Sequence, residues 1–207
     1  MLAHTKDDQA ETVLLRLTRG SGTRSLAAMR SVSLVRDGLP FWRPLLHIDR
    51  AVLRESLLHY NLTPYEDPHN QDQQFLRVVV RNQVMPMLKE KLGAGIVNSL
   101  ARTAELAQSD SDALDRLAQV AYVAARVDND LSIVALANEE HAISTRAIRL
   151  WLLELQVPGA ALDFNALVRL QRLVRESDQV GPISLPGVDV VKESGRLRAL
   201  RRNDGSG

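Results

Sequence analysis

A group of acidic residues near the start of the chain has the types and spacing needed to hold a cation. Asp7, Asp8 and Glu11 follow shortly after His4. Residues three and four positions apart lie on one face of a helix, so these carboxylates could bind a metal ion or a substrate ammonium group. Acids in a first helical turn also offset the helix dipole, by about 0.3 to 1 kcal/mol each, and spacing alone favours this simpler explanation. No second histidine follows at a metal-binding interval, so we predict no metal site built from histidines.

A basic segment follows the acidic group. Five arginines and no acid lie between Val13 and Arg36, whereas the whole chain carries Lys+Arg 26 against Asp+Glu 25, a formal charge of +1. A chain with so little net charge has no global field that attracts nucleic acid, so any nucleic-acid surface must be local. The sequence predicts such a surface in this segment.

The first element expected to position these residues is a helix of about three turns. Thr5 and Asp8 have the spacing of a capping box. An apolar stripe with helical spacing follows, at Val13, Leu14 and Leu17. Gly20 is a typical stop, and the segment from Gly20 to Arg36 is predicted to be a loop and a short helix.

Two further helices are predicted before residue 92. One begins at a cap on Asp49, ends near Pro64 and has an apolar inner face, formed by Val52, Leu53, Leu57 and Tyr60. The other begins at about Asp72 and must be kinked or ended by Pro86. Its inward residues are predicted to be Leu76, Val80, Val84, Met87 and Leu88.

The second half of the sequence is predicted to be mainly helical. Gly93 and Gly95 indicate a domain boundary, and residues 96–157 contain neither glycine nor proline. Their periodicity is helical except at Leu131 to Leu136, which could be a strand. Asp163 begins one more helix, which continues through Val174, and the tail from Ile183 to Leu200 is predicted to form short strands that turn at Ser194 and Gly195.

Composition excludes several kinds of site. The chain has no cysteine, so disulfides, thiolate zinc sites and a cysteine nucleophile are all excluded. No apolar run approaches the roughly 20 residues of a membrane span, and the start has no signal-peptide pattern. We therefore expect a cytoplasmic protein that does not bind membranes.

Two segments resemble one family. The run AHTKDDQAETVLLRLTRGSG, residues 3–22, resembles the HTxDDQAETxLLRLxRGSG segment of the tRNA(Ile)-lysidine synthetases, which belong to the PP-loop ATP pyrophosphatase superfamily. A second match follows, RPLL at residues 43–46 and then YEDPHNQDQQFLR at residues 65–77, which resembles that family's (W/Y)xDPSNxDxxFxRN element. The helical remainder, including TRAIRLWLLE, is similar to the domain that follows the catalytic one in this family.

The resemblance implies an α/β fold with two parts. Residues 1–91 would be the C-terminal part of a PP-loop domain, of the adenine nucleotide alpha hydrolase type, and residues 92–207 a mostly α-helical, tRNA-contacting domain with a terminal β-hairpin. The implied reaction uses ATP, with Mg²⁺, to adenylate the C2 carbonyl oxygen of the wobble cytidine in a CAU-anticodon tRNA(Ile). The amine of free L-lysine then displaces AMP and gives lysidine.

The resemblance also implies roles for individual residues. Asp8 and Glu11 would be catalytic, and both would bind the substrate lysine together with Asp7 and His4. A second set would bind the nucleotide or tRNA, and comprises Arg16, Arg19, Gly20, Ser21, Gly22, Asp67, Asn70, Asp72, Arg77 and Arg81. Asx turns that stabilise the loop are an equally good explanation for Asp67, Asn70 and Asp72.

Departures from the family pattern leave alternatives open. The superfamily's SGGxDS phosphate-binding loop should precede His4, and the given sequence does not contain it. We therefore predict that this chain alone is inactive. Because the apolar face of its first helix would lack a covering sheet, we also predict self-association, with a homodimer as one form. Val78 and Val79 stand where the family is often more polar. One alternative is a non-catalytic tRNA-binding remnant. Another, a DNA-binding helix-turn-helix at residues 144–155, leaves the first ninety residues unexplained.

Overall fold

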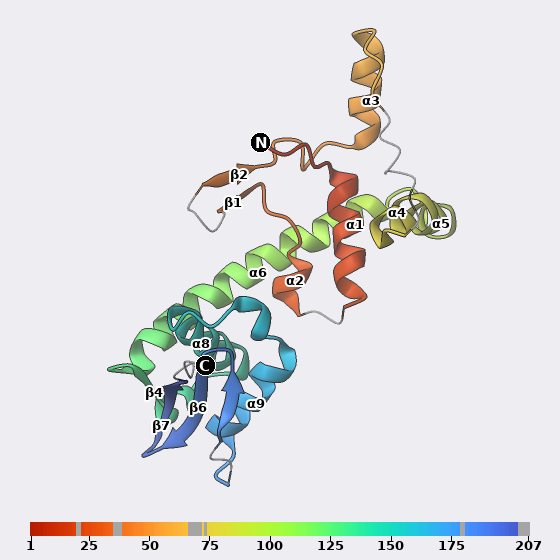
Figure 1. Cartoon of the computed structure of the whole chain (residues 1–207). Coiled ribbons are helices and arrows are strands. Elements are labelled where there is room, and N and C mark those ends of the chain that lie inside the picture. Colours follow the sequence, from red (N-terminus) through yellow and green to blue (C-terminus); the bar gives the residue numbers. More distant parts are fainter. Residues whose placement is uncertain (20–21, 35–38, 66–71, 73, 179–180, 203–207) are drawn as a thin grey trace, which may run out of the picture. The chain divides into compact units, whose positions relative to one another are not determined.

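A computed structural model describes residues 1–19, 22–34, 39–65, 72, 74–178 and 181–202 (Figure 1). The chain divides into two compact units, Met1–Ser111 and Asp112–Gly207. The long helix α6 (Ile96–Ala125) runs through the division. The domain boundary predicted between residues 91 and 92 lies at the end of the helix before α6, whereas the two compact units divide after Ser111. As a boundary between domains, the predicted position stays a prediction.

The first unit consists mainly of short helices. In chain order it contains α1 (Lys6–Leu17), α2 (Thr23–Leu26), an antiparallel pair of strands β1 (Val32–Leu34) and β2 (Pro40–Trp42), α3 (Arg50–His59), α4 (Leu76–Val79), the π-helical turn η2 (Val80–Val84), α5 (Met85–Leu92) and the first half of α6. Among the described residues, one buried apolar cluster of this unit consists of Ala10, Val80, Met85 and Val97.

The capping box predicted at the start of α1 is confirmed. The Thr5 backbone N–H donates to the Asp8 carboxylate at 2.8 Å, and the Asp8 N–H donates to the Thr5 hydroxyl oxygen at 3.3 Å. The predicted apolar stripe is only partly correct, since Val13 is fully buried but Leu17 is half exposed. The cap fixes the first turn of α1, which carries the acidic residues.

Pro86, which was predicted to kink or end its helix, does not end it, but the hydrogen-bond pattern before it changes. Proline clashes with the carbonyl four residues earlier and donates no backbone hydrogen bond. The chain accommodates it with the wider turn η2, in which the N–H of Met85 donates to the carbonyl of Val80, and Pro86 lies in the first turn of α5. The extra residue shifts the phase, so Met85 is buried whereas Met87 is 52% exposed, and the predicted inward position of Met87 is wrong.

Helix α3 begins where the sequence predicts, but its predicted inner face is wrong. None of its residues is buried, and Val52 and Tyr60 are both more than half exposed. Asp49 is its N-cap residue, yet the Asp49 carboxylate accepts from the Lys6 ammonium at 3.0 Å and forms no side-chain cap. The helical spacing of apolar residues thus predicted the helix correctly, but it did not predict whether these residues are buried.

The second unit packs helices against a sheet of five described strands. It contains the end of α6, β3 (Arg126–Val127), β4 (Asp130–Ser132), α7 (Ile133–Ala137), α8 (His141–Glu154), the 3-10 turn η3 (Gly159–Ala161), α9 (Phe164–Arg175), β5 (Ile183–Leu185), β6 (Val188–Glu193) and β7 (Arg196–Arg201). All neighbouring strands are antiparallel, in the order β3-β4-β7-β6-β5.

The terminal strands are confirmed, and so is the turn between β6 and β7. Ser194 and Gly195 both have positive φ, 49° and 74°, as a tight two-residue hairpin turn requires. The predicted strand from Leu131 to Leu136 is half correct, because the Ser132 side chain accepts from the Ala135 N–H and begins α7. Ile148 and Leu152 of α8 are fully buried in the core of this unit, so that side of the proposed helix-turn-helix is packed inside the protein.

Candidate functional site

Two carboxylates on α1 form the centre of the candidate site. Asp8 and Glu11 lie one helical turn apart and are 8% and 1% exposed. Buried carboxylates must be paired or fully hydrogen-bonded, because burial without a partner is costly. The partners of these two residues therefore define what the site can do.

Three arginines surround the two carboxylates. Arg50 donates from Nη2 to Asp8 at 3.0 Å and to Glu11 at 3.1 Å. Arg81 donates to Asp8 at 2.7 Å and to the two Glu11 oxygens at 3.0 Å each. Arg77 contacts the same two carboxylates at 3.4 and 3.5 Å. We call these five residues the carboxylate–arginine cluster.

All four carboxylate oxygens of the cluster accept hydrogen bonds. Oδ1 of Asp8 accepts from the three arginines, and Oδ2 accepts from the backbone N–H and hydroxyl of Thr5. Oε1 of Glu11 accepts from Arg50 and Arg81, and Oε2 from Arg77 and Arg81. The two carboxylates carry fewer charges than the three guanidiniums, so the cluster has an excess of positive charge.

The electrostatics of the cluster keep Asp8 ionised. Burial raises the pKa of Asp8, but the hydrogen bonds from Thr5 and the charges of Arg50 and Arg81 together outweigh burial and lower the pKa below its ordinary value. The hydrogen bond to Glu11 is the largest of the effects that raise the pKa of Arg81. Both shifts favour the charged forms that the ion pairs need.

The start of α3 is tied to the start of α1, which explains how Arg50 reaches the cluster. The Lys6 N–H donates to the Ile48 carbonyl at 3.0 Å, and the Arg50 backbone N–H donates to Oδ2 of Asp7 at 2.9 Å. Asp7 also meets the Lys89 ammonium at 3.5 Å. A small cavity of about 60 Å³ lies beside these groups, lined by Asp7, Glu11, Arg50, Arg81, Met85, Pro86 and Lys89.

His4 lies near the cluster as an uncharged group. Desolvation is the main reason that the pKa of His4 is lowered, the charge of Asp8 opposes that shift, and Arg77 and Arg43 add to it. Its Nδ1 atom is buried and has no hydrogen-bond partner among the described residues. The structure thus places four of the expected site residues on or next to α1, where the sequence predicted them.

The basic segment is held by two glutamines. The Gln9 amide exchanges two hydrogen bonds with the backbone of Met29, at 2.9 and 3.0 Å. Gln108 donates to the carbonyls of Ala27 and Met29 at 2.6 and 2.8 Å. These contacts fix the backbone of Ala27 and Met29, just after α2.

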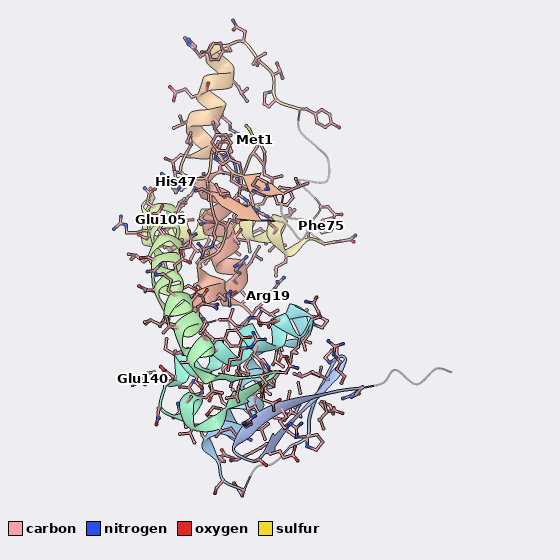
Figure 2. All side chains as sticks on the ribbon, turned by 90° about the vertical axis from the view of Figure 1, so that its left-hand side faces the viewer. Met1, Arg19, His47, Phe75, Glu105 and Glu140 are labelled. Atoms are coloured by element: carbon pink, nitrogen blue, oxygen red, sulfur yellow. The ribbon has the colours of Figure 1, made fainter. Side chains whose placement is uncertain are left out.

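The other expected site residues have more separate places. Arg16 donates to the Ser25 carbonyl at 2.8 Å, and desolvation lowers its pKa. Arg19 is exposed just beyond the end of α1 (Figure 2), and Gly22 is the N-cap residue of α2. Asp72 accepts from the Gln74 N–H at 3.0 Å, as in an Asx turn. Four further expected residues lie outside the described part of the chain: Gly20, Ser21, Asp67 and Asn70.

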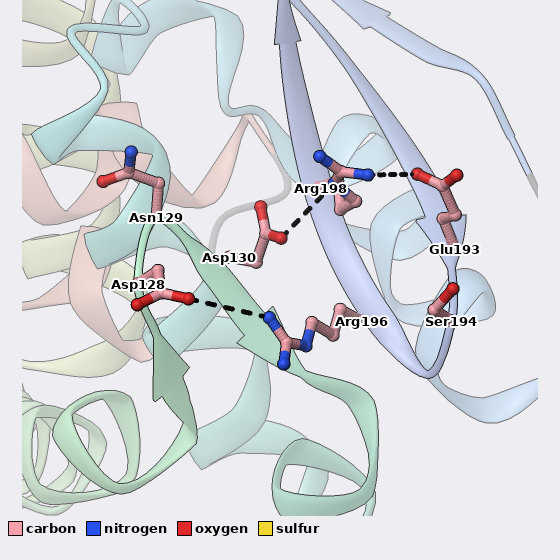
Figure 3. A pocket seen from close by; sticks show the side chains of 7 residues that line it. All are labelled: Asp128, Asn129, Asp130, Glu193, Ser194, Arg196 and Arg198. Carbon is pink, nitrogen blue, oxygen red and sulfur yellow. Dashed lines mark hydrogen bonds and ion pairs between the residues drawn. The ribbon is translucent and has the colours of Figure 1, made fainter.

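A second group of carboxylates and arginines lies in the second unit. It lines a pocket of about 480 Å³ between the β3–β4 turn and the β6–β7 turn, formed by Asp128, Asn129, Asp130, Glu193, Ser194, Arg196 and Arg198 (Figure 3). Arg198 bridges Asp130 at 3.3 Å and Glu193 at 2.6 Å, and Arg196 meets Asp128 at 3.8 Å. We call this group the turn pocket.

Arg50 is the cluster residue that the sequence did not indicate. It lies 42 positions from Asp8 and outside both family-like segments, so neither spacing nor resemblance pointed to it. The one available signal was that it directly follows the predicted helix cap at Asp49. Among the described residues, no group of three or more histidines and acids could hold a metal ion, and none of the described helices is both long and apolar enough to cross a membrane.

Comparison with known proteins gives two family matches and several close relatives. Residues 1–88 match the PP-loop domain, and residues 131–198 match the TilS substrate binding domain. The chain is 45% identical over 202 residues to a tRNA(Ile)-lysidine synthase of Rhodococcus erythropolis, covering 98% of this chain and 59% of the relative. It is 42% identical over 206 residues to that of Thermobifida fusca, covering 99% and 59%, and 39% identical over 203 residues to that of Streptomyces coelicolor, covering 98% and 57%. The chain spans about three fifths of the length of these relatives.

Proposed function

We propose, because the chain belongs to the tRNA(Ile)-lysidine synthetase family, that it takes part in the ATP-dependent ligation of lysine to a tRNA. The observation that carries this proposal is the succession of a PP-loop domain and a TilS substrate binding domain in one chain, at 45% identity to a named synthase. The proposed product is lysidine, formed at C2 of the wobble cytidine of a CAU-anticodon tRNA(Ile). The recognition made from the two sequence segments is confirmed by these comparisons.

The proposed reaction has two steps. The C2 oxygen of the cytidine first attacks the α-phosphate of ATP and releases pyrophosphate. The amine of lysine then forms the new bond to C2, and AMP leaves with that oxygen. Both steps bring phosphate groups to the site, so positive side chains are needed to bind them and to offset their charge.

The carboxylate–arginine cluster is chemically suited to phosphate, which both ATP and tRNA carry. Guanidinium groups bind phosphate oxygens with two parallel hydrogen bonds. The cluster is less suited to Mg²⁺, because all four oxygens of Asp8 and Glu11 already accept hydrogen bonds from the protein. We propose ATP as the co-substrate and assign no described residue of the cluster to Mg²⁺.

The roles of Asp8 and Glu11 in catalysis and lysine binding stay predictions. A lysine ammonium would have to displace an arginine from these carboxylates or share an oxygen with it. Asp7 is less fully engaged, since one of its oxygens meets only Lys89, at 3.5 Å, and it lines the small cavity next to Glu11. If lysine binds here, Asp7 offers the more accessible charge, with His4 nearby.

The arginine-rich end of α1 is proposed to contact tRNA. Arg19 is exposed, and Gln9 and Gln108 fix the nearby backbone just after α2, so we propose that this end of α1 meets RNA phosphates. The same positions would serve a protein that binds tRNA without modifying it. The two functions differ in whether lysine becomes attached.

The test is transfer of radiolabelled lysine to tRNA, made with the complete gene product and with the 207-residue chain. The proposal predicts labelling by the complete product that requires ATP and a CAU anticodon. A tRNA(Ile) that differs only in carrying a GAU anticodon is the matched control and should stay unlabelled. Tight tRNA binding by the complete product without any labelling would contradict the proposed ligase and support the binding protein.

A further inference from the structure

We propose that Asp8 and Glu11 are positioning residues, which hold Arg50, Arg77 and Arg81 as one phosphate-binding group. Arg50 is thereby assigned to the site, although it belongs to neither family-like segment. The inference deepens the proposed function and rests on it for the source of the phosphate, which is either the tRNA backbone or ATP.

The charge balance of the cluster is the first argument. Two carboxylates face three guanidiniums, so one positive charge is left over. The neighbouring Asp7 and Lys89 pair with each other and leave this balance unchanged. The carboxylate side chains are 11% and 2% exposed, whereas those of Arg50, Arg77 and Arg81 are 27%, 39% and 28% exposed. The negative charges are thus inside and the positive charges are outside. An arrangement of this kind presents an excess of positive charge to an approaching anion.

The unused hydrogen-bond donors are the second argument. Arg50 reaches the carboxylates through Nη2, and Arg77 and Arg81 reach them through Nε and Nη2. Among the described residues, none accepts a hydrogen bond from Nη1 of any of the three. Each Nη1 carries two N–H donors, so the cluster keeps six donors for a ligand. A phosphate group, with several acceptor oxygens, matches them better than a carboxylate of a single amino acid does.

The fixed orientation of the guanidiniums is the third argument. Arginine side chains lose much rotamer freedom when they bind a ligand, and that loss weakens binding unless it has already occurred. Here each guanidinium is held by both Asp8 and Glu11, so the three are ordered before a ligand arrives. The carboxylates reduce the net charge of the group, yet they make each remaining donor more effective.

The first experiment measures phosphate binding by Arg50→Gln in the complete gene product. Binding of fluorescein-labelled tRNA is followed by anisotropy over a series of KCl concentrations, and ATP binding by calorimetry. We expect tRNA affinity, ATP affinity or both to fall about tenfold. If tRNA is the ligand, the slope of log affinity against log salt should also decrease by about one, because one phosphate contact is lost. Arg102→Gln, at an exposed position of α6, is the matched control.

The two affinities identify the source of the phosphate. If only the affinity for tRNA falls, the cluster binds the phosphates of the tRNA backbone. If only the affinity for ATP falls, the cluster binds the phosphates of the nucleotide. Unchanged affinity for both overturns the inference. Neither measurement requires lysine transfer, so a product that fails to label tRNA would sink the proposed function and leave this inference standing.

The second experiment tests the positioning role itself with Glu11→Gln. Removal of a negative charge from a phosphate site should tighten binding if charge alone mattered. Positioning predicts the opposite, a severalfold weaker affinity for the same phosphate ligand, because the arginines lose one of their two anchors. Tighter or equal phosphate binding together with a raised KM for lysine would overturn the inference. It would support the alternative in which Glu11 binds the ammonium group of the substrate lysine.

A folding control accompanies these variants. Far-UV circular dichroism of Glu11→Gln must match that of the parent protein before its affinity is compared. If Glu11→Gln does not fold, Arg50→Lys replaces it, since this change keeps the charge and removes the guanidinium, whose Nη2 contacts both carboxylates while its Nη1 stays available to a ligand. Positioning then predicts that Arg50→Lys binds phosphate nearly as weakly as Arg50→Gln, and affinity equal to that of the parent protein would contradict it.

Discussion

The carboxylate–arginine cluster and the turn pocket use the same two kinds of side chain in different surroundings. In the cluster, two buried acids hold three arginines. In the turn pocket, three acids face two arginines, and the pairs are open to solvent, with Glu193 54% and Arg198 45% exposed at the side chain. Burial and stoichiometry therefore separate the two sites more clearly than residue type does.

The difference shows why one site is a better candidate for phosphate. The turn pocket has an excess of negative charge and its ion pairs are screened by water, so neither its charge nor its rigidity favours an anion. The cluster has the opposite charge balance and is desolvated on its acidic side. Residue type alone would not separate the two sites, because both consist of carboxylates and arginines.

The largest expected effect comes from removing one buried acid. Glu11→Ala leaves three guanidiniums against one carboxylate, and we expect a loss of about 3 kcal/mol of stability, at the low end for a broken buried pair because the arginines keep part of their surface in water. Hydrogen exchange of the α1 amides measures this loss locally, apart from the second unit.

Glu193→Ala is the matched change in the turn pocket. It removes a carboxylate with the same chemistry from an exposed pair, so the amides of β6 and β7 should exchange almost as in the parent protein. Equal losses from Glu11→Ala and Glu193→Ala would remove the distinction between the two sites.

A smaller effect is expected from acid. The folded pKa of Asp8 lies below its unfolded value, so the unfolded chain takes up the proton first as pH falls. The stabilisation is therefore complete above the ordinary pKa of 3.8 and is lost as pH falls through the lowered folded value. Exchange of the α1 amides should accelerate in that acidic window. The Asp8→Asn variant should be less stable than the parent protein at neutral pH. In this variant the acceleration of α1 amide exchange caused by protonation of Asp8 should be absent.

Local features of the first unit could be predicted from sequence, whereas its long-range contacts could not. The capping box of Thr5 and Asp8 depends on residues three apart, so the sequence alone identified it. The pairing of Arg50 with the same Asp8 spans 42 positions and depends on how α3 meets α1. The predicted site thus included the acids and two arginines but omitted the third arginine, which changes the charge balance.

The errors in the predicted burial have equally specific causes. Met87 was expected to face inward on a regular helix, and the π-helical turn before Pro86 moved Met85 into that place. The apolar residues of α3 repeat with helical spacing, but none of them is buried. In the second unit the strands were predicted well, because turn residues such as Gly195 mark their ends locally.

The smallest expected effect concerns Arg198, which joins two acids of the turn pocket. Arg198→Gln removes the bridges to Asp130 and Glu193. Glu193 and Arg198 are about half exposed and Asp130 keeps part of its surface in water, so the change in stability should be about 0 to 1 kcal/mol. Because exposed pairs are screened by ions, even this difference should shrink in 1 M KCl, where the screening length is about 3 Å. Urea unfolding at low and high salt measures both values. A loss that is large and independent of salt would mean that the turn pocket is held as rigidly as the cluster, and would make it a second candidate site in its own right.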